Sequence, residues 1–242
     1  MINLSADNEM AIVECNFCHQ KDEYDIIDVI DSELDIFEKN KLIGGTLFEH
    51  KCSNCGKSIN YYYNMVYYDK PHNVMIYYVP NANHIGPFCA GLALTNLSMT
   101  RHAVEFGEDL PEIVDWIQRV VCSPSVLMEK AIIFEAGLDD RVIEIIKLMC
   151  LSLVFERHPN FIHEQSKFYI ENGLWFIELC GLENKENQSH GSYTVGVQCD
   201  MYNKVLETAQ TILEDSDKHF VIDEEWALNV LEYDGKDSLR YS

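Results

Sequence analysis

Two short cysteine pairs decide the fold of the N-terminal part of this 242-residue chain: Cys15-Asn16-Phe17-Cys18 and Cys52-Ser53-Asn54-Cys55. Each pair has the spacing C-x-x-C, and 33 residues separate Cys18 from Cys52. Two such pairs can supply four thiolates to one tetrahedral ion, most often zinc, at about 2.3 Å per sulfur. The spacing therefore predicts a metal site formed by Cys15, Cys18, Cys52 and Cys55.

The chemistry of four thiolates favours a structural role for this site. Four protein ligands complete the tetrahedron and leave no open position for a substrate. Zinc is the expected ion, and iron in a rubredoxin-like site fits the same geometry. A redox C-x-x-C is the weaker alternative, because two pairs would then be a coincidence. His19 and His50 lie within two residues of a cysteine and could support or replace a ligand, or simply be exposed.

Composition indicates a globular, cytoplasmic protein. The chain is 47% apolar and 24% charged, which is typical of a folded domain. It has no run of about 18 apolar residues, so no membrane span is expected. Residues 1–14 lack the apolar core of a secretory signal. The five cysteines outside the pairs are accordingly expected to be mainly buried, reduced thiols: Cys89, Cys122, Cys150, Cys180 and Cys199.

The formal net charge of −22 limits the partners that this protein can bind. A negative field repels phosphate backbones and anionic lipid, so neither nucleic acid nor a membrane is expected. It suits a freely soluble protein or one with a basic protein partner. Residues 22–38 carry eight acids with apolar residues interleaved, and these acids are expected to form a solvated face.

The first 80 residues predict a small β-rich unit whose thin core a metal would supplement. A strand is expected to about Ile30, then a short helix with Asp31 or Ser32 as N-cap and Gly44 as its stop. Residues 46–51 should form the strand that enters the second cysteine pair. Residues 57–79 resemble a hairpin, because turn-forming residues 69–73 separate two β-rich runs.

The remainder, 81–242, is expected to be a helical middle followed by an α+β region. Pro80 and the Asn, Gly and Pro residues after it place a domain boundary near residue 80. Further along, Glu171-Asn172-Gly173 is typical of a hairpin turn. Expected helices are one from near Pro111 that includes Ile117 and Val120, then 126–136, 138–157, 202–213 and 224–231; expected strands are 167–170, 174–179, 192–198 and 220–222. The predicted class is α+β, with domains 1–80 and 81–242.

The cysteine pairs and the segments around them resemble the bacterial CpXC family, which is named for its N-terminal cysteine motif. The resemblance covers both pairs, the acidic insert and the tyrosine-rich strands that end at Val79-Pro80, and it extends into residues 129–147. It implies a zinc-ribbon-like domain in a cytoplasmic bacterial protein, and no particular activity. The second pair fits the family pattern through Gly56. The first departs from it, with Asn16 in place of proline and His19 in place of glycine.

Two other groups of residues invite a functional interpretation. The first group comprises Asp139, Asp140, Glu144 and Lys147. Asp140 and Glu144 could form a general acid/base pair or a cation site. The alternative is that Asp139 or Asp140 caps a helix and that Glu144 forms a surface ion pair with Lys147. The tyrosines at 61–63, 67 and 68 could stack on bases or pack a small sheet. Because residues 1–80 contain no arginine and 13 acids against 6 lysines, sheet packing is the favoured interpretation.

The hypothesis that unites these observations is a zinc-stabilised, non-enzymatic protein that serves as a structural or protein-binding module. No nucleophile elbow, phosphate-binding loop or zinc-protease motif occurs in the sequence. One alternative is an acidic inhibitor or immunity-type protein that masks a basic partner through the insert 22–38. Another is an enzyme that works at Asp139, Asp140 and Glu144.

Overall fold

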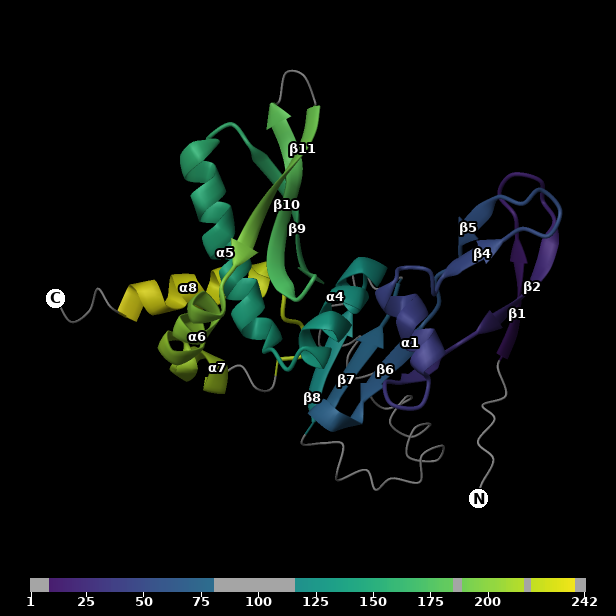
Figure 1. Ribbon diagram of the computed structural model, residues 1–242, viewed down its shortest axis with the longest axis horizontal. Helices are drawn as coiled ribbons and strands as arrows, with labels where there is room; N and C mark the ends of the chain where they lie inside the picture. Colours follow the sequence, from purple (N-terminus) through teal and green to yellow (C-terminus); the bar gives the residue numbers. More distant parts are fainter. Residues whose placement is uncertain (1–8, 81–115, 185–188, 216–218, 238–242) are drawn as a thin grey trace. The chain divides into compact units, whose positions relative to one another are not determined.

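The computed structural model describes residues 9–80, 116–184, 189–215 and 219–237 (Figure 1). Its helices and strands place the protein in the α+β class, as the sequence predicts. Contacts divide the chain into two units, Met1–Met128 and Glu129–Ser242. The expected boundary near residue 80 adjoins residues 81–115, which lie outside the described ranges, so that boundary stays a prediction. The expected helix start near Pro111 lies within these residues.

The first unit contains, within its described residues, two small two-stranded sheets, a four-stranded sheet and helix α1. Its elements are β1 (Glu9–Glu14), β2 (Lys21–Ile26), β3 (Val29–Asp31), α1 (Ile36–Ile43), β4 (Glu49–Lys51), β5 (Ser58–Asn60), β6 (Met65–Asp69), the 3-10 turn η1 (Lys70–His72), β7 (Val74–Tyr78), β8 (Ile117–Val121) and the start of α4 (Pro124–Glu135).

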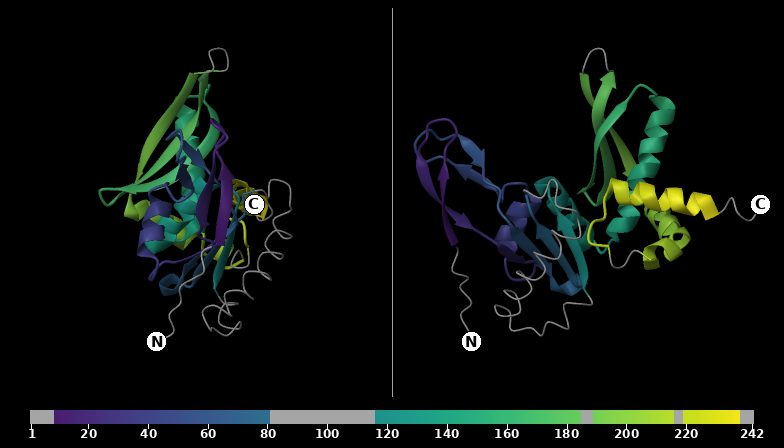
Figure 2. Two further views of the ribbon diagram at one scale, coloured as in Figure 1. Left: turned by 90° about the vertical axis from the view of Figure 1, so that its right-hand side faces the viewer. Right: turned by 180° about the vertical axis from the view of Figure 1, so that it is seen from behind.

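Each two-stranded sheet is an antiparallel hairpin with one cysteine pair at its turn. Strand β1 pairs with β2, and β4 pairs with β5. The two hairpins lie side by side in every view (Figures 1 and 2). Because an isolated two-stranded hairpin is marginally stable in water, further interactions are needed to hold these two.

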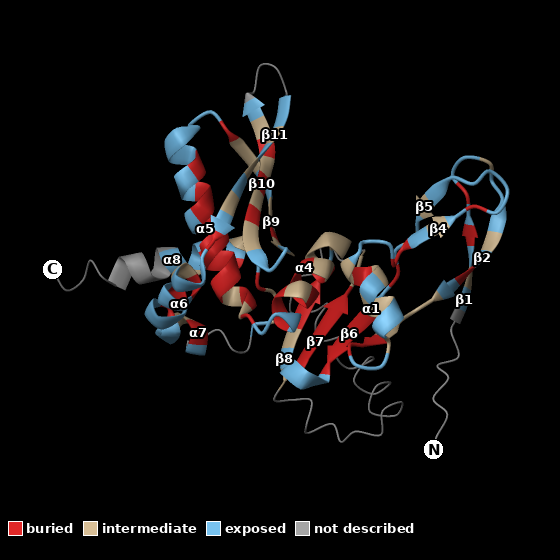
Figure 3. Ribbon diagram, viewed as in Figure 1, coloured by how far each residue is buried: buried red, intermediate tan, exposed pale blue. Residues whose placement is uncertain are grey.

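The four-stranded sheet has the order β3-β6-β7-β8 and is mixed. The β3–β6 and β7–β8 pairs are parallel, and β6 and β7 are antiparallel. Every residue of β6 and β7 is buried, as in a strand that is covered on both faces (Figure 3). The preference for sheet packing is confirmed for Tyr67 and Tyr68, whose exposures of 0% and 2% exclude stacking on bases.

Three expectations for the first unit are wrong. Residues 117–121 form strand β8 and no helix, because pairing with β7 decides how a short β-branched run folds. Neither Asp31 nor Ser32 caps α1, because the helix begins later, at Ile36, and Asp35 holds the N-cap position. The Asp31 carboxylate instead accepts hydrogen bonds from the amides of Glu33 and Leu34. Residues 58–60 pair with β4, so the predicted hairpin is confined to β6 and β7.

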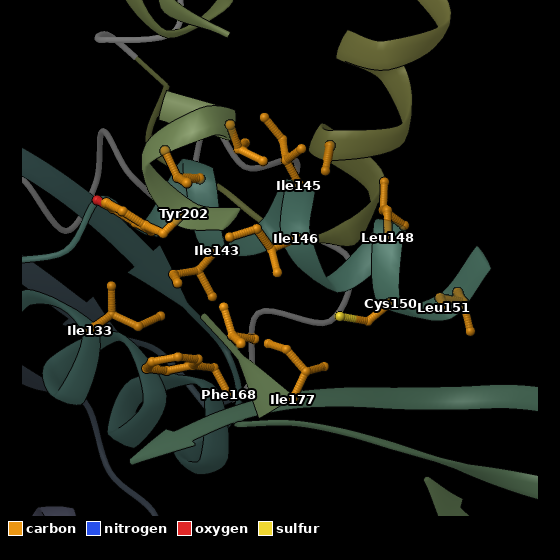
Figure 4. Packing of buried hydrophobic residues seen from close by; sticks show 14 of the residues in the cluster. Ile133, Ile143, Ile145, Ile146, Leu148, Cys150, Leu151, Phe168, Ile177 and Tyr202 are labelled. Carbon is orange, nitrogen blue, oxygen red and sulfur yellow. The ribbon is translucent and has the colours of Figure 1, made fainter. Parts of the chain in front are cut away.

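The second unit packs helices against one face of a three-stranded antiparallel sheet of order β11-β10-β9. The elements that follow α4 are α5 (Asp140–Arg157), β9 (Ile162–Glu171), β10 (Leu174–Asn184), β11 (Ser189–Val197), α6 (Cys199–Thr208), α7 (Gln210–Asp215) and α8 (Glu224–Asp237). Helix α5 is central, because it contacts β9, β10, α6 and α8. Its residues Ile143, Ile146 and Cys150 pack near Phe168 and Ile177 of the sheet (Figure 4).

Local signals in the second unit identify its turns and caps well. The predicted hairpin turn is confirmed, with Asn172 and Gly173 at φ values of 51° and 76°. Asp223 caps α8 by accepting a hydrogen bond from the Trp226 amide at 2.9 Å. The expected strand 220–222 is wrong, since these residues are irregular. In the described part of the chain no helix has the length and apolar character that crossing a membrane requires.

Candidate metal centre

The four predicted cysteines come together where the two hairpins meet. Their sulfur atoms all lie within 4.8 Å of one another. The Sγ atoms of Cys15 and Cys55 are 3.6 Å apart, as are those of Cys18 and Cys52. A tetrahedron with metal–sulfur bonds of 2.3 Å has edges of about 3.8 Å, whereas a disulfide would need about 2.05 Å. All four thiols are free, and their arrangement is compatible with metal binding.

The two cysteine turns have the same backbone hydrogen bonds, so one is a structural repeat of the other. In the first, the Cys15 amide donates to the Gln20 carbonyl and the His19 amide to the Cys15 carbonyl, each at 2.9 Å. In the second, the Cys52 amide donates to the Lys57 carbonyl and the Gly56 amide to the Cys52 carbonyl, each at 3.0 Å. The backbone therefore positions both sulfur pairs in the same way.

The last residue of each turn adopts a left-handed conformation. Gly56 has a φ of 69°, which glycine adopts without strain. His19 occupies the equivalent position with a φ of 59°, where a side chain costs about 1–2 kcal/mol. The departure from the family pattern at this position therefore leaves the turn geometry intact, at some cost in stability.

The four thiols influence one another's ionisation. A backbone hydrogen bond from Gln20 is the main cause that lowers the pKa of Cys18 to about 6. The amide of Lys57 acts to lower the pKa of Cys55, but desolvation and the three neighbouring thiols raise it to about 11. Cys18 therefore loses its proton more readily than Cys55. A bound divalent cation would offset the negative charge of the thiolates.

Asp22 supports the second cysteine turn, a role that its position in an acidic run did not suggest. Its carboxylate accepts hydrogen bonds from the Ser53 hydroxyl at 2.6 Å and the Ser53 amide at 2.9 Å, and it lies 3.0 Å from Nε2 of His50. The hydrogen bonds from Ser53, followed by that with His50, hold the pKa of Asp22 far below its usual value. The carboxylate therefore stays charged at any pH at which thiolates bind a metal.

The two histidines near the cysteines have different surroundings. His50 contacts Asp22 and is one-sixth exposed, so it supports the turn through that carboxylate. His19 is exposed and pairs with Glu14 at 2.9 Å. Neither belongs to the group of four candidate ligands. A local signal for His50 existed, since it lies two residues before Cys52, but its partner Asp22 is 28 residues away and could not be foreseen.

Aromatic side chains form the core beneath the cysteine turns. Tyr24 of β2 contacts His50 and Tyr63 edge-on, with ring centroids at 5.6 and 6.0 Å. Its hydroxyl donates to the Leu47 carbonyl at 2.9 Å. Phe48, next to β4, contacts Tyr63 and also Tyr78 of the four-stranded sheet, with centroids at 5.2 Å for the latter pair. The hairpins are therefore joined to the sheet by ring packing as well as by the chain.

Comparison with protein families identifies the relatives of this chain. A family model described as CpXC protein matches residues 13–147. The chain belongs to the CpXC family. The match confirms the resemblance seen in the sequence, and it includes all four clustered cysteines and residues 129–147. No curated protein matches the chain. No solved structure matches it either.

Among the residues that the structure describes, the other cysteines of this CpXC protein do not join the cluster. Cys150 is buried in the core of the second unit, as expected, and burial raises the pKa of its thiol to about 11. Cys122 and Cys199 are exposed, which contradicts the expectation of buried thiols, and Cys180 is half-buried. Cys89 lies outside the described residues. The four described cysteines outside the cluster are free thiols: Cys122, Cys150, Cys180 and Cys199.

The second predicted constellation proves to be a buried chain of ion pairs. Lys130 Nζ lies 2.9 Å from Asp140 Oδ2 and 3.1 Å from Glu144 Oε1. Lys147 Nζ lies 3.1 Å from the same Glu144 oxygen and also contacts Glu129. All five residues are at most 5% exposed, so the expectation of a surface ion pair at Lys147 is wrong. The helix-cap interpretation is confirmed for Asp139, which accepts a hydrogen bond from the Arg141 amide.

This buried ion-pair network joins three elements of the second unit. Glu129 lies on α4, Glu144 and Lys147 lie on α5, and the second Glu129 oxygen accepts a hydrogen bond from the Phe168 amide of β9 at 3.1 Å. Desolvation raises the pKa of Glu129 above its usual value. Burial alone would lower the pKa of Lys147, but Glu144 and Glu129 raise it. Each carboxylate thus has an internal partner and is shielded from solvent.

The left-handed position in each turn predicts opposite effects of two substitutions. Gly56→Ala should lower the free energy of unfolding of the metal-loaded protein by about 1 kcal/mol. The nearest atom to an added Cβ is 4.0 Å away, so the cost is conformational. His19→Gly should raise the free energy of unfolding by about 0.5 kcal/mol, because relief of strain is partly offset by unfolded-state entropy. Urea denaturation measures both, and equal signs would contradict the repeat geometry.

Replacement of Asp22 should weaken metal binding without removing a ligand. In Asp22→Asn one acceptor oxygen is lost, so the Ser53 turn is held less firmly and the affinity for added Zn²⁺ should fall about tenfold. Competition with a chromophoric chelator measures this affinity. Asp25→Asn is the matched control, because Asp25 is an exposed acid of the same strand. An equal loss in both variants would indicate a general charge effect.

The buried ion-pair network predicts a large loss of stability when one cation is removed. Lys130→Met leaves Asp140 and Glu144 with less compensating charge in the core and should cost about 3–5 kcal/mol. The exposed Lys204→Met on α6 should change stability by less than about 0.5 kcal/mol. Urea denaturation compares the two. A small loss in Lys130→Met would mean that the network tolerates a missing cation.

Proposed function

We propose that this CpXC protein is a zinc-stabilised protein-binding module of the bacterial cytoplasm. The observation that carries the proposal is the meeting of four free thiols from two turns within 4.8 Å. Four sulfur atoms that can coordinate one ion tetrahedrally favour zinc. Iron is the alternative, because the same four thiolates can bind it. Because the hairpins are short, metal binding would supply part of their folding energy.

Several features support a binding role over a catalytic one. A four-thiolate zinc site has no open position at which a substrate could be activated. Asp140 and Glu144, the candidate acid/base residues, are buried and paired with lysines. Their surroundings support a structural role, because a general base needs access to its substrate. A protein is the favoured partner, since the net charge of −22 opposes nucleic acid and anionic lipid.

A second candidate function is that of an inhibitor or immunity-type protein for a basic partner. Its support is the excess of acids in residues 22–38, which contain eight carboxylates and no basic residue. Acidic surfaces of this kind attract basic proteins at long range and speed association. Both candidates require the zinc-stabilised first unit, and they differ only in the consequence of binding.

Metal analysis tests the zinc proposal directly. Protein that is purified without chelators should contain about one zinc ion per chain. Cys52→Ser should lose the metal, because it removes a buried ligand, and its first unit should become sensitive to proteolysis. Cys199→Ser, which alters an exposed cysteine outside the cluster, should keep both the metal and the protease resistance.

Each outcome of this experiment has a clear meaning. If the protein contained one equivalent of iron in place of zinc, the four-thiolate site would be supported and the identity of its ion would be corrected. Absence of any metal from the native protein, together with an unaltered digestion pattern for Cys52→Ser, would refute the proposal that metal stabilises the first unit.

A further inference from the structure

Three large apolar side chains within four residues of the sequence are exposed where α1 begins. Leu34 is 73% exposed, Ile36 is 48% exposed and Phe37 is 66% exposed. We call these three residues the α1 surface. Helix α1 buries only Leu42 fully; Ile36, Phe37 and Asn40 are exposed, and the other residues of the helix are half-buried (Figure 3). Apolar side chains that gather on a surface, unlike single exposed ones, are characteristic of interaction sites.

The backbone that presents the α1 surface is held by hydrogen bonds. Asp31 is buried, and its Oδ1 accepts from the amides of Glu33 and Leu34 at 2.8 and 3.1 Å. In return, Asp35 Oδ2 accepts from the Asp31 amide at 2.9 Å. The buried Ser32 hydroxyl donates to Asp69 at 2.9 Å. Because the turn is already ordered, a partner would bind it with a small entropic cost.

The acids beside the α1 surface favour a cationic partner. Residues 33–38, which carry this surface, contain Glu33, Asp35 and Glu38 and no basic residue, and Lys39 and Lys41 follow them on α1. Glu33 is exposed and Glu38 is half-buried, one on either side of the apolar group in the sequence. The Phe37 ring already receives a cation of its own helix, since Lys41 Nζ lies 4.3 Å from the ring centroid. An apolar surface with acidic neighbours fits a segment that combines apolar and basic side chains.

We propose that the α1 surface is the docking site for a basic amphipathic helix of a partner protein. Apolar residues of that helix would contact Leu34, Ile36 and Phe37, and its lysines or arginines would face Glu33 and Glu38. The inference rests on the proposed role as a protein-binding module and adds the surface and the chemistry of the partner. In this proposal the apolar contact supplies most of the binding affinity, and the charges set the orientation of the bound helix.

A synthetic helical peptide tests this inference. The probe is a fluorescein-labelled 18-residue peptide of leucine and lysine with one apolar face, and fluorescence anisotropy measures its Kd for the full-length, metal-loaded protein. The double variant Leu34→Ser/Phe37→Ser keeps every charge and should raise the Kd at least about tenfold. The matched control is Leu153→Ser/Phe155→Ser, which removes the same residue types, exposed by 45% and 40%, from α5. The control should leave the Kd unchanged.

Charge variants separate specific docking from general attraction to an acidic protein. Glu33→Gln/Glu38→Gln should raise the Kd about threefold and weaken its dependence on salt. The same peptide with glutamate in place of lysine should not bind. Equal binding by the wild type and Leu34→Ser/Phe37→Ser would overturn the inference, as would no binding by the wild type. Either result, obtained on protein with its full metal content, would leave the zinc proposal standing.

Discussion

The meeting of four sulfur atoms between two hairpins is the constraint that brings the N-terminal strands of the first unit together. Each hairpin alone is a short pair of strands, which is marginally stable at best in water. The sulfurs of Cys15 and Cys55, and those of Cys18 and Cys52, meet across the two turns, so each pair of neighbouring thiols joins one hairpin to the other. Four thiols so close cannot all ionise unless a cation offsets their charge, so a bound metal would couple ligation to folding.

The two units are stabilised by different interactions. In the first, ring packing among Tyr24, Phe48 and Tyr63 extends the small core beneath the cysteine turns toward the four-stranded sheet. In the second, the apolar residues of α5 supply a continuous core, and the buried ion-pair network adds specific partners for α4 and β9. Buried ion pairs contribute little net stability relative to apolar residues of similar size, so we expect their more important effect here to be on the relative register of these elements.

The strong acidity of the chain is therefore not a uniform surface property. Asp22, Asp31 and Asp69 each accept hydrogen bonds that order a turn of the first unit. Asp140 and Glu144 are neutralised inside the second. The acids of residues 22–38 that remain open to solvent include Glu23, Asp25 and Glu33, for which the expected solvated face is confirmed. A smaller set of carboxylates thus defines the surface that a partner would meet.

The sequence alone predicted the four-cysteine cluster, because two C-x-x-C pairs together match the ligand count of one tetrahedral ion even though they lie far apart in the chain. It also predicted the hairpin turn at Asn172-Gly173 and a helix cap at Asp139 or Asp140 from adjacent residues, and the α+β class from the pattern of its segments. Contacts between distant residues decided the rest. Pairing with β7 made residues 117–121 a strand, because a short apolar run satisfies helix and strand patterns equally. Likewise Asp22 reaches Ser53, and Lys130 reaches Asp140 and Glu144, only after folding. No local pattern records which buried charge will find a partner, because that depends on how separate elements pack.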